Sequence, residues 1–302
     1  MAVATQPKPY VHALPGGQEG ATVRVRPLLG AEILAPEPGF YDRPSGPLPL
    51  AMAHTFATRR SKWRPTPIPA FLIDHPTAGP VLVDTALHTS VATDPADNLG
   101  ALGARMYSIR MRPEQAIPAQ LEALGVDPHA VKTVVMTHLH YDHASGVSQF
   151  PQATFVVSRA EWAAACSGGT FQGYRHRQFD HAFDWRTIDY EDTSLVSSFA
   201  AFGRSVDLFA DGSIRLVSTP GHTPGHQSVI VRLHDRELLL TGDAAYRRRT
   251  IDPGETPLLI ADEHLFARSL GEIRQYLEMT PTAEVICGHD PENWPKLAEV
   301  YS

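Results

Sequence analysis

One short segment constrains the fold more than any other part of the chain. Residues 133–143 read Thr-Val-Val-Met-Thr-His-Leu-His-Tyr-Asp-His, an apolar run typical of a buried strand, followed by four polar side chains. Alternate residues of an extended chain point to the same side, so His138 and His140 can face one metal ion. The turn that must follow lets Asp142 and His143 face a second ion. Burying four polar side chains costs free energy unless each of them has a partner. The segment therefore predicts a metal site at a strand end.

Three more residues of the same chemical type stand in equivalent places. His222, Asp243 and His289 each follow an apolar run that predicts a strand, and each stands beside a glycine where the chain can turn sharply. One such residue means little, whereas their repetition along one chain indicates a common centre. Because the set holds imidazoles and carboxylates but no thiolate, it favours zinc in a catalytic site with an open coordination position.

Composition excludes several other kinds of protein. The chain has 302 residues, 15 of them histidine and only two cysteine, so neither a disulfide scaffold nor a thiolate-rich zinc site is available. A net charge of −7 gives no reason to expect a nucleic-acid partner. No segment approaches the roughly 18 apolar residues of a membrane helix, and the first 20 residues do not resemble a secretory signal. We therefore expect a cytoplasmic protein that contacts no membrane.

Strand and helix patterns alternate along most of the chain. Residues 1–20 resemble a flexible arm, and residues 21–302 are expected to form a single layered α/β domain. The proline-rich stretch 30–69 is predicted to be an irregular loop that covers or binds something. The predicted strands are 21–29, 133–136, 153–158, 213–218, 227–233, 236–241 and 285–287, with a hairpin of 71–73 and 81–83 and helices at 114–124 and 262–279.

The order of these residues resembles a known family. The pattern His138-x-His140-x-Asp142-His143, followed by His222, Asp243 and His289, is similar to that of the metallo-β-lactamase superfamily. The segments Thr-Pro-Gly-His-Thr-Pro-Gly-His-Gln-Ser at 219–228, Asp-Ala-Ala-Tyr at 243–246 and Gly-His-Asp at 288–290 look most like its N-acyl homoserine lactonase branch. The resemblance runs from about residue 68 to the carboxyl terminus. It implies a four-layer αββα sandwich with the metals at one edge of the two sheets.

The resemblance also assigns roles position by position. It implies two divalent metal ions, with zinc first and iron, cobalt or manganese as alternatives. One ion would take His138, His140 and His222, the other would take Asp142, His143 and His289, and Asp243 would bridge both. Tyr246 matches the tyrosine that contacts the substrate carbonyl region in the lactonases. Tyr141 is interpreted as packing and His226 as support for the loop that carries His222.

The function implied by the resemblance is hydrolysis of a small-molecule lactone. A hydroxide that bridges the two ions would attack the carbonyl, Tyr246 would donate a hydrogen bond to it, and Asp142 would lie near the released alkoxide. N-acyl homoserine lactones are the first choice of substrate, and another metallohydrolase of the same fold, such as a phosphotriesterase or a different lactonase or esterase, is the alternative. A non-enzymatic metal-binding protein is disfavoured because all seven ligands are present. The family resemblance also leaves a homodimer open.

Two parts of the chain depart from the family pattern. The histidine- and aromatic-bearing stretch 166–205 looks longer than in compact lactonases, and the segments before residue 68 look extended. Both are candidate walls of a substrate pocket, with His176 and His181 as candidate lining residues. The run Arg247-Arg248-Arg249 fits a solvated face better than an anion clamp.

Overall fold

The computed structural model describes the chain except residues 1–2, 107 and 253–254. The described residues form two β-sheets that face each other. The larger sheet has the strand order β1-β8-β7-β6-β4-β3-β2-β5 and the smaller the order β14-β13-β12-β11-β10-β9. The larger sheet contains β1 (Lys8–Pro9), β2 (Arg24–Pro36), β3 (Trp63–His75), β4 (Gly79–Val83), β5 (Ile109–Arg110), β6 (Thr133–Val135), β7 (Thr154–Ser158) and β8 (Asp184–Ile188). The smaller contains β9 (Ser197–Phe199), β10 (Phe202–Asp207), β11 (Ile214–Ser218), β12 (Gln227–Arg232), β13 (Glu237–Leu240) and β14 (Glu284–Ile286).

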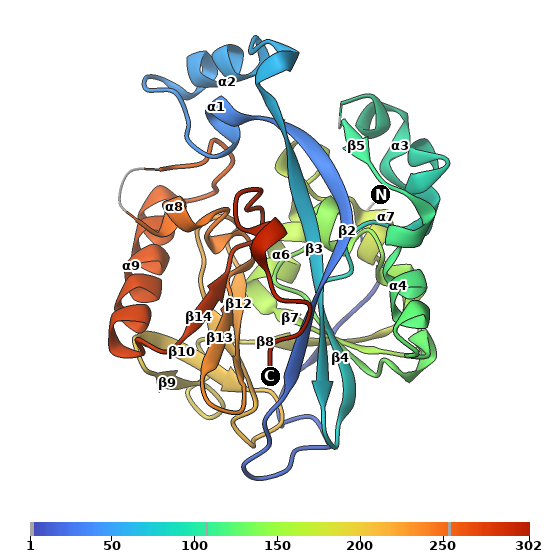
Figure 1. The fold of residues 1–302 in the computed structure, drawn as a ribbon, viewed down its shortest axis with the longest axis vertical. Helices are drawn as coiled ribbons and strands as arrows, with labels where there is room; N and C mark the ends of the chain where they lie inside the picture. Colours follow the sequence, from blue (N-terminus) through green and yellow to red (C-terminus); the bar gives the residue numbers. More distant parts are fainter. Residues whose placement is uncertain (1–2, 107, 253–254) are drawn as a thin grey trace.

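Helices cover the outer faces of both sheets. Figure 1 shows α9 on one side of the molecule and α4 on the opposite side, with the strands between them. The described helices are α1 (Glu37–Phe40), α2 (Leu48–Phe56), α3 (Pro95–Met106), α4 (Ile117–Ala123), α5 (Tyr141–Ala144), α6 (Arg159–Ser167), α7 (His176–Phe179), α8 (Arg248–Ile251) and α9 (Glu263–Met279). Among the described residues, no helix is both long enough and apolar enough to cross a bilayer.

Three apolar clusters separate the layers. The central cluster joins the two sheets and includes Val25 and Ile73 from the larger sheet and Val229 and Leu238 from the smaller. A second cluster packs helices against the outer face of the larger sheet, and a third packs α9 against the smaller sheet. The order of layers is therefore helix, sheet, sheet, helix, which confirms the predicted αββα sandwich.

The proline-rich stretch 30–69 is more regular than predicted. It contains the end of β2, helices α1 and α2, and the first half of β3, so the prediction of an irregular loop was wrong. Pro65, Pro67 and Pro69 alternate along β3, which pairs with β2 on one side there and with β4 only from Phe71 onward. Because a strand's N–H groups point alternately to its two sides, the prolines leave every donor that β2 needs in place.

The amino-terminal segment lies against the body of the protein. Lys8 and Pro9 form β1, which pairs in parallel with β8, and the Tyr10 side chain is buried with its hydroxyl donating to the Leu208 carbonyl at 2.8 Å. The N–H of Thr5 donates to Asp180 at 2.8 Å. The described part of the segment predicted as a flexible arm is thus held by strand pairing and hydrogen bonds.

Candidate metal centre

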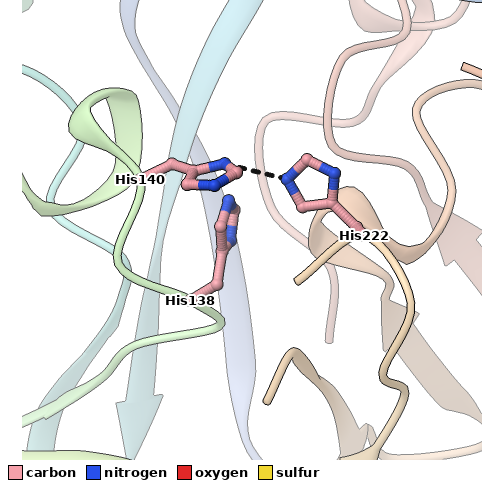
Figure 2. Close-up of side chains that lie close together, drawn as sticks. All are labelled: His138, His140 and His222. Carbon is pink, nitrogen blue, oxygen red and sulfur yellow. Dashed lines mark hydrogen bonds between the residues drawn. The ribbon is translucent and has the colours of Figure 1, made fainter. Parts of the chain in front are cut away.

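Three imidazoles converge where the two sheets meet. His138 and His140 follow β6 of the larger sheet, whereas His222 follows β11 of the smaller sheet. Figure 2 shows the three rings pointing toward one another, with His222 Nε2 and His140 Nδ1 3.0 Å apart. One ligand atom from each residue lies within 4.8 Å of the others, which is close enough for one cation to contact all three.

A second group of ligand-type side chains lies beside the first. Asp142 and His143 belong to α5, the single helical turn that follows His140, and His289 follows β14. Their ligand atoms also lie within 4.8 Å of one another, and Asp142 Oδ2 is 3.6 Å from His289 Nε2. The helical turn redirects the chain, so neighbouring residues of one motif face two different points.

Asp243 lies between the two groups and presents one oxygen to each. Its Oδ2 is 3.3 Å from His222 Nε2 and 3.9 Å from His138 Nε2. Its Oδ1 is 3.4 Å from His143 Nε2 and 3.2 Å from His289 Nε2. The preceding Gly242 has φ +52°, a conformation that favours glycine and turns the chain sharply after β13. The side chain therefore has the geometry of a bridge between two cations.

The Nδ1 atoms of three ligand histidines, which point away from the centre, form hydrogen bonds with other parts of the chain. His143 Nδ1 lies 2.7 Å from Asp84 Oδ2, His289 Nδ1 donates to the Pro67 carbonyl at 2.7 Å, and His222 Nδ1 donates to the Leu259 carbonyl at 3.0 Å. These contacts orient each ring so that Nε2 points to the centre, as is usual for histidine ligands of metals.

Several buried atoms at the centre have no hydrogen-bond partner among the described residues. They are His138 Nε2, His143 Nε2 and Asp243 Oδ1. Leaving such atoms unpaired in the interior costs free energy, and all three are good ligands for a divalent cation. The donor set therefore fits the metal ions that the sequence implies.

Burial lowers the pKa values of the three imidazoles of the first group, whereas at His143 and His289 the nearby carboxylates outweigh burial and raise them. Burial lowers the pKa of His140 to about 4 and also lowers the pKa values of His138 and His222, with neighbouring histidines adding to the effect at the latter two. These imidazoles are neutral near pH 7 and ready to bind a cation. Burial alone would raise the pKa of Asp243, but His289, His143 and His222 outweigh it and hold that pKa well below its usual range.

Tyr246 borders both groups of ligands. Its ring centroid is 5.5 Å from that of His222 and 5.3 Å from that of His289, and its hydroxyl lies 3.3 Å from His222 Nδ1. Burial, with the nearby carboxylates of Asp243 and Asp142, raises the pKa of the phenol, so it remains a hydrogen-bond donor.

Residues that the sequence did not single out also shape the centre. Asp84 accepts hydrogen bonds from the N–H and hydroxyl of Thr137 at 2.8 and 2.7 Å, besides its contact with His143. It directly follows the apolar run of β4, so the strand-end pattern that indicated the other residues applied here too. Tyr41 donates its hydroxyl to the His289 carbonyl at 3.1 Å, and Phe40 packs 5.1 Å from Tyr246, centroid to centroid.

The supporting roles differ in part from expectation. His226 Nε2 accepts the N–H of Asp243 at 2.9 Å. Its imidazole therefore supports the loop that carries Asp243 as well as the loop that carries His222. Tyr141 is buried in the core of the larger sheet. Arg247, expected on a solvated face, is only 6% exposed, makes paired hydrogen bonds to Glu255 and lies 4.3 Å over the Tyr41 ring.

The stretch 166–205 reaches the centre around His140. Tyr174 forms an isolated β-bridge with His140, and their ring centroids lie 5.0 Å apart. His176, by contrast, lies with its Nε2 3.1 and 3.0 Å from the carbonyls of Ala165 and Gly168, within its own segment. Phe171 is 88% exposed.

Comparison with known proteins agrees with this geometry. A family model described as the metallo-beta-lactamase superfamily matches residues 63–289. The N-acyl homoserine lactonase AttM of Azorhizobium caulinodans is 37% identical over 235 residues, which cover 76% of this chain and 84% of the relative. The protein of the same name from Agrobacterium fabrum is 37% identical over 243 residues, covering 78% and 88%.

Solved structures show the same fold. An N-acyl homoserine lactone hydrolase, determined with the product N-hexanoyl-L-homoserine bound at its catalytic metal centre, superimposes with a TM-score of 0.73. The match covers 92% of this chain and 97% of that chain at 21% sequence identity.

Proposed function

This chain belongs to the metallo-β-lactamase superfamily, and from that premise we propose that it is a metal-dependent hydrolase that opens the ester ring of N-acyl homoserine lactones. The observation that carries the proposal is the position of Asp243, with one oxygen toward each of two groups of ligands. The curated relatives at 37% identity are named as lactonases of this substrate class.

The proposed centre holds two divalent cations. His138, His140 and His222 would hold the first, Asp142, His143 and His289 would hold the second, and Asp243 would bridge them. We propose zinc because imidazole and carboxylate ligands in a buried site suit it well. When bound, the two cations supply a Lewis acid for the ester carbonyl and an activated water as the nucleophile.

The chain's own residues position the substrate and its protons. The Tyr246 hydroxyl, kept protonated by burial, is placed to donate a hydrogen bond to the carbonyl oxygen as negative charge develops there. Asp142 lies on the His289 side of the centre, where its carboxylate is placed to take a proton from the attacking water and pass it to the leaving oxygen. Water adds to the carbonyl carbon, the ring C–O bond breaks, and the product is the open hydroxy acid.

A hydrolysis panel with metal analysis of the same sample tests this proposal. Ring opening of a lactone releases a proton, so the pH drop can be followed with N-acyl homoserine lactones, a simple γ-lactone, a phosphotriester and a cephalosporin. We expect the fastest turnover with the acyl homoserine lactones and about two metal ions per chain. Turnover of the phosphotriester alone would contradict the proposed substrate, and a protein that binds no metal would contradict the proposed centre.

A further inference from the structure

A buried carboxylate outside the ligand set joins the loops that carry the first three imidazoles. Glu161, in the first turn of α6, has no exposed surface. Its Oε1 accepts the N–H of Leu139 at 3.0 Å and the hydroxyl of Tyr174 at 3.1 Å, and its Oε2 accepts the N–H of Gly225 at 3.2 Å. One side chain therefore receives hydrogen bonds from three separate segments.

The positions of these donors in the sequence explain why the contact matters. Leu139 stands between His138 and His140, and Gly225 stands three residues after His222. The first loop follows a strand of the larger sheet and the second follows a strand of the smaller sheet. The Glu161 carboxylate thus links the two loops, one after each sheet, that carry the three rings of Figure 2.

Close packing supports the same interpretation. A Cβ atom added to Gly225 would lie 2.0 Å from the Glu161 backbone nitrogen, so the His222 loop is pressed against the start of α6. Tyr174 brings in the third segment, because its backbone forms a bridge with His140 while its hydroxyl reaches Glu161. A neighbouring backbone hydrogen bond, from the Tyr141 N–H to the Gly173 carbonyl at 2.9 Å, also joins the segment of Tyr174 to the loop that carries His140.

Filling space in the core would not explain why position 161 is a carboxylate. The hydrogen bonds to its carboxylate come from neutral donors, two backbone N–H groups and a hydroxyl, and burial raises the pKa of the group. Burying a carboxylate without a counter-ion is costly, and a well-packed apolar residue would stabilise the fold more simply. What the carboxylate provides, and an apolar side chain could not, is acceptors for two backbone N–H groups on different loops.

We infer that Glu161 is a positioning residue that sets the spacing between His138, His140 and His222 and thereby the affinity of the first metal position. The inference rests on the proposed function, because it takes the two-metal centre as its premise. Glu161 does not touch the ligand rings themselves; it acts through Leu139, Gly225 and Tyr174.

Metal-binding measurements on three variants test the inference. In Glu161→Gln the amide nitrogen cannot accept, so one of the two backbone N–H groups loses its partner, while size is preserved. The matched control is Ser158→Ala, which removes the hydroxyl that caps α6 by accepting the Glu161 N–H at 3.0 Å but removes no acceptor from the carboxylate itself. Tyr174→Phe removes one hydrogen bond to Glu161 and keeps the ring beside His140.

The readout is zinc per chain after dialysis against buffered zinc, together with the visible spectrum of the cobalt-substituted proteins. We expect about two ions in the wild type and in Ser158→Ala. In Glu161→Gln the affinity of one position should fall by about 10- to 100-fold, the usual effect of losing an outer partner of a metal ligand, with the second position unchanged. Tyr174→Phe should show a smaller loss at the same position.

The outcomes separate this inference from the proposed function. Two ions bound with wild-type affinity by Glu161→Gln, or equal loss from both positions, would overturn the role of Glu161 and leave the metal centre standing. An equal loss in Ser158→Ala would overturn it too, because helix stability would then be the cause. If Glu161→Gln does not fold, wild-type affinity in Tyr174→Phe overturns the inference. A wild-type protein without metal would refute the proposed function itself.

Discussion

Tyr246 is the side chain whose chemistry depends most on where the fold places it. The ring lies beside both His222 and His289, and its hydroxyl lies 3.3 Å from His222 Nδ1. Phe40 packs against the ring, and burial raises the pKa of the phenol. A tyrosine held in this way donates a hydrogen bond without needing to move, and such preorganised donors contribute strongly to catalysis.

Replacing Tyr246 by phenylalanine should separate rate from metal binding. We expect kcat to fall by about 100-fold, as when a single oxyanion donor is removed, while the zinc content stays at the wild-type level. Tyr41→Phe is the matched control, because it removes a buried hydroxyl that bonds to the His289 carbonyl and lies outside the proposed reaction path. Steady-state kinetics and metal analysis of both variants measure kcat and zinc content. An unchanged kcat in Tyr246→Phe would show that Tyr246 takes no part in the mechanism.

The residues at which chemistry and strand pattern coincide lie close together in the structure. His138, His222, Asp243 and His289 could be indicated because each follows an apolar run, and the structure brings their side chains together. Asp84 also directly follows an apolar strand, but it was not among the predicted residues. Its role depends on Thr137 and His143 more than 50 residues away, and no local pattern reveals such partners.

Arg247 shows the opposite error. Within a run of three arginines it resembled a solvated residue, and its neighbour Arg249 is indeed exposed, with 64% of its side-chain surface accessible. The Arg247 guanidinium is instead buried against Glu255 and the Tyr41 ring. Glu255 is only eight residues further along, but Tyr41 comes from a distant part of the chain, and no local pattern pairs either of them with Arg247 rather than with the next two arginines.

At the scale of the element, periodicity was a reliable guide and composition was not. The predicted helix over 262–279 corresponds to α9 within one residue at its start, and the hairpin of 71–73 and 81–83 corresponds to the pairing of β3 with β4. The stretch 30–69 is not the loop that its proline frequency predicts, because it contains parts of two strands and two short helices. Along β3 the spacing of two residues between prolines is what matters, since it confines the missing donors to one side of the strand.

Helix α9 offers an element-scale test. Ile273 is fully buried between the helix and the smaller sheet, so Ile273→Ala should lower the free energy of unfolding by about 3 kcal/mol through lost burial and a residual cavity. Gln275 on the exposed face is the control, and its replacement by alanine should change stability by less than about 0.5 kcal/mol. Denaturant unfolding of the metal-loaded protein measures both. Equal effects of the two substitutions would contradict the packing described for α9.

For the whole molecule, the proposed centre is also a cross-link. His138 and His140 come from the larger sheet, and His222 comes from the smaller sheet, so a cation held by all three joins the two halves of the sandwich. Without a cation, several buried polar atoms at the junction lack partners among the described residues. Metal binding should therefore contribute to the stability of the entire fold as well as to its chemistry.

Removing the metal should consequently lower both activity and stability. A ligand present at about 1,000 times its dissociation constant stabilises a folded protein by about 4 kcal/mol, so chelation should lower the Tm by roughly 10 °C. Calorimetry before and after chelation measures the shift. Zinc should restore the Tm and the hydrolysis rate together, whereas magnesium, which prefers oxygen ligands, should restore neither. An unchanged Tm would show that the cations do not hold the sheets together.

The alternating prolines of β3 have one more consequence. Along the edge that faces away from β2, from Pro65 to Pro69, the strand presents carbonyl oxygens but no N–H groups, and one of those carbonyls accepts the hydrogen bond from His289. Pro67 and Pro69 are buried, so most of this edge lies inside the protein. Pairing with a further strand would need hydrogen bonds given as well as received, and this edge can only receive them. The prolines therefore exclude another strand from this side of β3 and leave the Pro67 carbonyl to orient a histidine of the centre.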